Sequence, residues 1–206
     1  MRTLTREEGK LITRRRLIEA AARILRESGY GGLSASAVAR EAGVAQPTFY
    51  VHFADKEALV RALASEKVEA IRKPLKDARA RIVGGGLDAL RETFRVSLAA
   101  LVEQPELFRL FVQEAQQPGS PFGEQARLLQ RELEADLVDD LVALGAPGRS
   151  REERLRLEMM ADGIVTLTER LGMGHIDGRY PDLNAVIEVL TQVAVGSLRS
   201  LGIFGS

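Results

Sequence analysis

Several residues of this 206-residue chain whose types and spacing could do chemistry lie close together in its first quarter. Gln46 carries an amide that can make a bidentate contact to adenine. Thr48 and Tyr50 carry hydroxyls that can bond to phosphate, and His52 can donate from its ring in either protonation state. Pro47 and Thr48 also offer apolar contact to a thymine methyl group. Together these side chains predict a surface that contacts DNA.

Two short helices joined by a glycine turn would position these side chains. Ser34 is a suitable N-cap for the first helix, because its hydroxyl can accept from an N–H of the first turn. Ala39 is small enough for a second helix to cross close to it. Gly43 suits the chain reversal, since glycine adopts positive φ without a Cβ clash. Val44 and Phe49 would then pack back, which predicts a helix-turn-helix with its second helix in a major groove.

The distribution of charge supports a DNA-binding N-terminus. Residues 1–56 hold ten Lys or Arg against six Asp or Glu, whereas residues 57–206 hold 19 against 23. A basic N-terminal module on an acidic body is typical of a small DNA-binding domain. Lys56 adds a cation at the start of the next helix, and the basic cluster 14–16 is expected near the phosphates.

The segment QPTFYVHFADKEALV resembles the recognition helix and the start of the fourth helix in TetR-family repressors, and the resemblance covers about residues 10–60. It implies a three-helix helix-turn-helix DNA-binding domain over 1–56, a connecting helix from residue 55, and a ligand-binding and dimerisation domain over 57–206. The family often has Lys or Arg where this chain has Ser36. By this resemblance the DNA-facing positions are Ser36, Gln46, Pro47, Thr48, Tyr50, Val51, His52 and Lys56.

The rest of the chain also favours helices, because Ala, Leu, Arg and Glu dominate it. The predicted fold class is therefore all-α. Pro74 is expected to kink or interrupt the helix that starts near residue 56, and the glycine run 84–86 to end that segment. The other helices predicted from apolar periodicity span about 9–28, 87–102, 105–115, 122–144, 151–171 and 183–201, with loops at 116–121 and 172–182.

The last two predicted helices are unusually apolar, and the final one has more than a single apolar stripe. One explanation is burial inside a monomer; the other is a second chain. TetR-like proteins pair their two C-terminal helices into a four-helix interface, so the resemblance implies a homodimer through residues 150–202. A two-fold protein also matches a palindromic operator in double-stranded DNA.

A DNA-binding domain on a helical body suggests a ligand-controlled switch, in which a small hydrophobic effector changes the spacing of two DNA-binding domains. Plain core packing is the alternative role for the apolar residues of the middle helices. The residues predicted to line an effector cavity are Phe94, Leu98, Leu101, Phe108, Phe111, Val112, Phe122 and Leu129.

A second resemblance concerns the effector. The segments KDARARIVGGGLDALRETF, PELFRLFVQE and GSPF, between about residues 76 and 141, resemble the TetR branch that regulates unsaturated fatty acid synthesis. This implies a long-chain acyl thioester such as acyl-CoA, with Arg109, Arg127 or Arg131 near its anionic headgroup. The alternative is an aromatic metabolite or a drug, as in repressors of efflux operons; the scarcity of Trp and Tyr argues mildly against it.

Other classes of function find little support in the sequence. The chain has no cysteine and two histidines, without an HExxH pattern, so neither a metal site nor a cofactor is expected. The glycine run 84–86 lacks the Lys-Ser/Thr of a phosphate loop. We therefore do not expect the protein to be an enzyme. An interaction protein that has lost DNA binding is a further alternative. Without a signal peptide or a membrane-length apolar run, a cytoplasmic location is expected.

Overall fold

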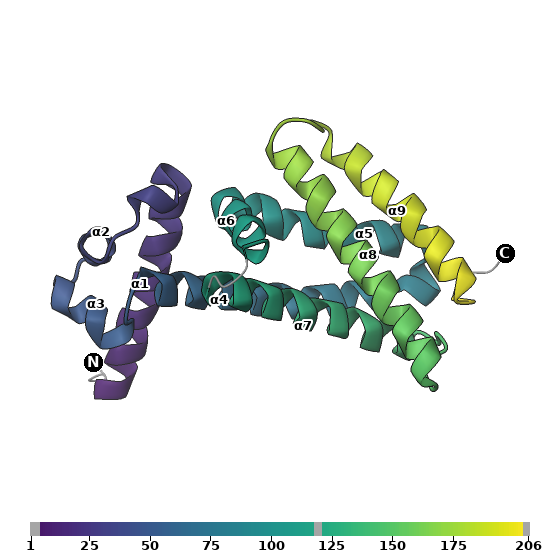
Figure 1. The fold of residues 1–206 in the computed structure, drawn as a ribbon, viewed down its shortest axis with the longest axis horizontal. Helices are drawn as coiled ribbons and strands as arrows, with labels where there is room; N and C mark the ends of the chain where they lie inside the picture. Colours follow the sequence, from purple (N-terminus) through teal and green to yellow (C-terminus); the bar gives the residue numbers. More distant parts are fainter. Residues whose placement is uncertain (1–4, 118–120, 204–206) are drawn as a thin grey trace. The chain divides into compact units, whose positions relative to one another are not determined.

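The structure is a computed structural model that describes residues 5–117 and 121–203. Every regular element in these ranges is a helix (Figure 1), which confirms the predicted all-α fold. None of these helices combines the length and the apolar character of a membrane span. In chain order the elements are α1 (Arg6–Ser28), the 3-10 helix η1 (Tyr30–Gly32), α2 (Ala35–Glu41), α3 (Gln46–His52), α4 (Lys56–Arg79), α5 (Ile82–Glu103), α6 (Pro105–Ala115), α7 (Pro121–Ala143), α8 (Arg151–Ile176) and α9 (Leu183–Ser200).

The chain forms two compact units whose segments alternate along the sequence. The N-terminal unit comprises Met1–Lys67 and Gln104–Ala126, and the C-terminal unit comprises Val68–Glu103 and Arg127–Ser206. The division predicted from sequence lay at residue 56, whereas the structure divides within α4. It also groups α6 with the N-terminal helices.

The core of the N-terminal unit is built from α1, α2, α3, the first half of α4, and α6. Leu17, Leu25 and Phe49 are completely buried in it. Leu107 and Leu110 of α6 join the same core, and α6 packs against α1. The helix-turn-helix is therefore supported by a segment that lies far from it in sequence.

The C-terminal unit is organised around α5, α8 and α9, which all contact one another. Helices α8 and α9 lie antiparallel and side by side (Figure 1). Leu98 of α5, Leu157 of α8 and Leu190 of α9 are buried in the shared core. Burial of each such side chain contributes about 1.5–3 kcal/mol relative to leaving it in water.

Helix ends follow the local signals closely, with two differences in the middle of the chain. Helix α1 begins at a capping box formed by Thr5 and Glu8, and ends at Gly29, which has φ 63°. Pro74 does not interrupt α4: it lies on the exposed face, where water can reach the carbonyl that loses its partner. The glycine run is helical up to Gly86. The φ of 57° at Gly86 kinks the helix between its short first turn and the rest of α5.

The prediction that residues 172–182 form a loop was wrong in its first half, because α8 continues to Ile176. Gly172 and Gly174, in this helical half, serve close packing rather than chain reversal. A Cβ at Gly172 would lie 3.0 Å from Leu101 and 3.1 Å from Leu98, and one at Gly174 would lie 2.5 Å from the ring of Tyr180. The lack of a side chain at Gly172 lets α8 approach α5.

Candidate DNA-binding surface and effector cavity

The turn between α2 and α3 is held by hydrogen bonds on both sides. Ser34 Oγ accepts from the Ala37 N–H at 3.1 Å, so the predicted N-cap is confirmed. Gly43 has φ 66°, in the left-handed region that favours glycine. Arg16 of α1 donates from Nη2 to the Ala42 carbonyl at 2.6 Å. These contacts fix the direction in which α3 leaves the turn.

One side of α3 is buried and the other is open to solvent. Phe49 is fully buried, with its ring centroid 5.9 Å from that of Phe53 and 5.3 Å from that of Tyr50. Tyr50 and Val51 remain 55% and 65% exposed. Across α3 as a whole, Gln46, Pro47, Tyr50 and Val51 are exposed, and Thr48 and His52 are half-buried.

The two predicted DNA-facing positions outside α3 flank it in the same unit. Ser36 is exposed in the first turn of α2, with its Oγ 3.2 Å from that of Ser34. Lys56, at the start of α4, places its Nζ 4.2 Å from the centroid of the Tyr30 ring. The Tyr30 hydroxyl donates to Glu57 at 2.9 Å, and burial together with that carboxylate raises the pKa of Tyr30. The Lys56 ammonium is thus held against an aromatic face.

Basic side chains from α1 lie close to the end of α3. Arg14 stacks over Phe53 at 5.2 Å and pairs with Glu66 at 3.2 Å. Partial burial, followed by the positive charges of Lys10 and Arg14, lowers the pKa of His52. This shift favours the neutral ring, which can still donate one N–H.

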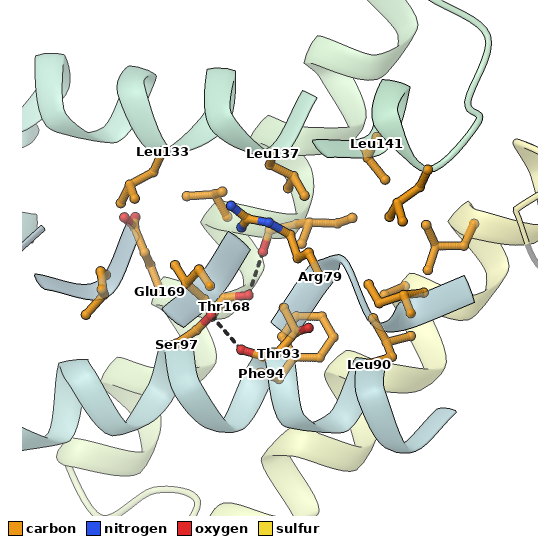
Figure 2. A pocket seen from close by; sticks show the side chains of 18 of the residues that line it. Arg79, Leu90, Thr93, Phe94, Ser97, Leu133, Leu137, Leu141, Thr168 and Glu169 are labelled. Carbon is orange, nitrogen blue, oxygen red and sulfur yellow. Dashed lines mark hydrogen bonds between the residues drawn. The ribbon is translucent and has the colours of Figure 1, made fainter. Parts of the chain in front are cut away.

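A cavity of about 120 Å³ opens in the C-terminal unit, between side chains of α4, α5, α7, α8 and α9 (Figure 2). Its walls are mostly Leu, Ile, Val and Phe. The polar groups among its lining residues are Arg79, Thr93, Ser97, Thr168 and Glu169.

Most of these polar groups are satisfied by the protein itself. The hydroxyls of Thr93, Ser97 and Thr168 donate to carbonyls one turn earlier in their own helices, at 3.1, 3.0 and 2.7 Å. Arg79 donates from Nε to Asp140 at 2.6 Å. Within the part of the chain that the structure describes, Glu169 makes no hydrogen bond or ion pair.

The environment of Glu169 disfavours its charged form. Burial, followed by the carboxylates of Glu134 and Asp162, raises the pKa of Glu169 to about 7. Burial also raises the pKa of Glu134, against a hydrogen bond from Gln130 that lowers it. A carboxyl group that titrates near neutrality in an apolar cavity is a candidate functional group.

The predicted cavity residues are placed in different parts of the fold. Phe94 and Leu101 line the cavity, and Leu98 is buried in the adjoining core. Leu129 is buried on α7 but is not among the lining residues. Phe108, Phe111 and Val112 lie on α6 in the N-terminal unit. The side chain of Phe122 lies outside the described residues.

The sequence-based prediction missed the contributions of α4, α8 and α9 to the cavity, including Glu169. A signal was present in the sequence. Glu169 follows Val165 by four residues and precedes Gly172 by three, so it lies on the apolar side of α8. A carboxylate at such a position requires an explanation.

Comparison with known proteins supports the interpretation of the helix-turn-helix. Residues 17–63 match the sequence model of the family described as bacterial regulatory proteins, tetR family. Over these residues the chain is similar to TetR-family regulators. The match runs from the middle of α1 through α2 and α3 to the start of α4, and it includes all the predicted DNA-facing positions.

Several solved structures share the fold of most of the chain. The fatty acid degradation regulator FadR from Bacillus halodurans is 20% identical, with 91% of this chain and 96% of that chain covered and a TM-score of 0.66. Thermus thermophilus FadR, in complex with lauroyl-CoA, is 22% identical, with 88% and 93% covered and a TM-score of 0.62. The multidrug binding protein EbrR, complexed with imidazole, is 22% identical, with 87% and 93% covered and a TM-score of 0.61. At these identities the likeness shows the fold alone.

Proposed function

We propose that the protein is a repressor that binds a palindromic operator as a dimer and is controlled by a small hydrophobic effector. The observation that carries the DNA-binding part is the open face of α3, where polar groups surround an exposed Tyr50 while Phe49 anchors the opposite side. This arrangement suits a helix that enters a major groove.

The side chains of this face divide into two roles. Gln46 reads a base edge through its amide, and Pro47 and Thr48 contact a thymine methyl group. Tyr50 and His52 bond to phosphates, which position the protein without carrying sequence information. Val51, Ser36 and Lys56 complete the surface. The Lys56 ammonium supplies charge at the N-terminus of α4, where backbone N–H groups also favour an anion.

A second copy of the chain is proposed to pack on α8 and α9. Leu155 and Met159 of α8, and Val189 and Val193 of α9, are between 47% and 59% exposed in the single chain. Each pair is four residues apart, so each lies on one face of its helix. Sedimentation at micromolar concentration tests this proposal, which predicts the mass of a dimer and is contradicted by that of a monomer.

The effector is proposed to bind in the cavity of the C-terminal unit. Sites for drug-sized ligands have volumes of roughly 300–1,000 Å³, so a cavity of about 120 Å³ must widen to accept one. Widening displaces its walls, which include Ile71, Leu75 and Arg79 of α4. The same helix begins at Lys56, in the DNA-binding surface, so α4 offers a direct mechanical connection.

A long-chain acyl thioester is the first candidate effector. The apolar walls suit an acyl chain, and the resemblance of residues 76–141 and the FadR structures, one of them with lauroyl-CoA, support this class. The second candidate is a drug-like molecule with a polar group. Glu169 in the cavity favours it, and the multidrug binding protein EbrR supports it.

The proposal is tested by gel shift with the promoter region beside the protein's own gene. A saturable complex that is released by an effector supports the proposed function, and the absence of any complex contradicts it. Thermal-shift titration with oleoyl-CoA, palmitoyl-CoA and a panel of dyes separates the two classes. No shift with either acyl thioester would exclude the first one.

A further inference from the structure

We infer that the cavity of the C-terminal unit takes a lipophilic cation, whose positive group is held by the Glu169 carboxylate. This inference rests on the proposal that the cavity is the effector site, and it chooses between the two candidate classes. An acyl chain offers the Glu169 carboxylate no partner, whereas a cation can pair with it.

The Glu169 carboxylate lies at one end of the cavity. Figure 2 shows its carboxylate beside Leu133, at the opposite end of the labelled lining residues from Leu90 and Leu141. No described side chain donates to it. A ligand that spans the cavity with its apolar part could therefore place one polar group at this end.

The cavity offers little to an anion. Arg79 is its one cationic lining residue among those described, and its Nε already donates to Asp140 at 2.6 Å. The hydroxyls of the wall donate to their own helices rather than into the cavity. An anionic headgroup would have to share the charge of Arg79 with Asp140.

The charges that act on Glu169 are negative. Glu134 of α7 and Asp162 of α8 both act on it with negative charge, and Arg131 acts on Glu134 with positive charge. Three carboxyl groups against one arginine produce a local potential that attracts cations. Because burial and these neighbours hold part of the Glu169 population protonated near pH 7, a bound cation must drive that proton off.

The test uses three probes with the same ten-carbon chain: decyltrimethylammonium, decanol and decanoate. The charge of the quaternary ammonium is independent of pH, so any pH dependence of its binding comes from the protein. Calorimetry with the full-length protein is expected to give the tightest binding for the cation. Since Glu169 releases one proton, the affinity for decyltrimethylammonium should rise about tenfold between about pH 6 and about pH 8. Decanol should show no such rise.

Variants separate the role of Glu169 from a general effect on folding. Glu169→Gln should lose both the preference for the cation and its pH dependence, while still binding decanol like the wild type. Glu169→Asp keeps the charge and should keep the pH dependence. Glu158→Gln, on an exposed position of the same helix, is the matched control and should behave as wild type.

The outcomes distinguish this inference from the proposed function. If decanoate or lauroyl-CoA bound more tightly than the cation, or if Glu169→Gln left the cation affinity unchanged, the inference would be overturned while the effector site stood. If none of the probes bound, the effector site and the inference would both fail. Release of DNA by the cation, lost in Glu169→Gln, would support both.

Discussion

Arg79 of α4 donates from Nε to the Asp140 carboxylate of α7 at 2.6 Å, and both side chains are almost fully buried. One side of Arg79 forms part of the cavity wall. Two turns earlier on α4, Arg72 makes a bidentate contact to Asp136 at 2.7 and 2.9 Å. These pairs join α4 to α7 beside the cavity, so an effector that moves α4 must strain or break them.

Replacing Asp140 by Asn should lower the free energy of unfolding by about 3–5 kcal/mol, because it leaves the buried Arg79 without a compensating charge. Urea denaturation measures this change. Asp139→Asn is the matched control: Asp139 is exposed and pairs with Arg154 at the surface, where such pairs contribute about 0–1 kcal/mol. Equal effects of the two substitutions would contradict a special role for the buried pair.

Gln46→Ala should relax the preference at one base pair of each half-site by roughly 1–3 kcal/mol, because it removes the amide that reads adenine. The measurement is binding to operator variants that carry each base at each position. An unchanged preferred sequence in this variant would show that Gln46 does not read a base.

Tyr50→Phe should weaken binding to all DNA sequences by about 1 kcal/mol, the usual contribution of one hydrogen bond. The phenol is exposed in the free protein, so the loss should fall on DNA binding and leave stability unchanged. Tyr180→Phe, in the C-terminal unit, serves as the control. A sequence-selective loss in Tyr50→Phe would instead assign Tyr50 to base readout.

The stability of the protein should depend on Glu169 between about pH 4.5 and pH 7. In this range the folded state keeps a proton that the unfolded state releases, since the pKa is raised from 4.5 to about 7. The resulting stabilisation is complete at the acidic end and disappears as pH rises through 7. Melting temperatures of the wild type and Glu169→Gln should therefore converge or cross as pH changes, and parallel curves would contradict the shifted pKa.

Much of the fold could be predicted from the sequence because its signals are local. The cap at Ser34 and the turn at Gly43 both act within a few residues, and the structure confirms each of them. Glycine is ambiguous in the same local view. At Gly43 it permits a positive φ, whereas at Gly172 it permits contact between helices, and sequence spacing alone does not separate the two uses.

The cavity was harder to predict because it is made by tertiary packing. Phe111 and Phe94 have similar local contexts, yet Phe111 packs on the core of the N-terminal unit and Phe94 lines the cavity. Which apolar face meets which partner depends on how α6 and α5 pack in three dimensions. Glu169 was missed as well, although it could have been predicted, since a carboxylate on the apolar side of a helix is visible in the sequence.

The most direct test of DNA recognition by α3 is selection of bound sequences from a random pool of duplex DNA, with purified full-length protein and Gln46→Ala in parallel. The account predicts an enriched inverted repeat, bound by two chains with an affinity that falls as salt rises. It also predicts that one position in each half-site becomes degenerate with the variant. Enrichment of no sequence, with no salt-sensitive retention on any duplex, would contradict the account.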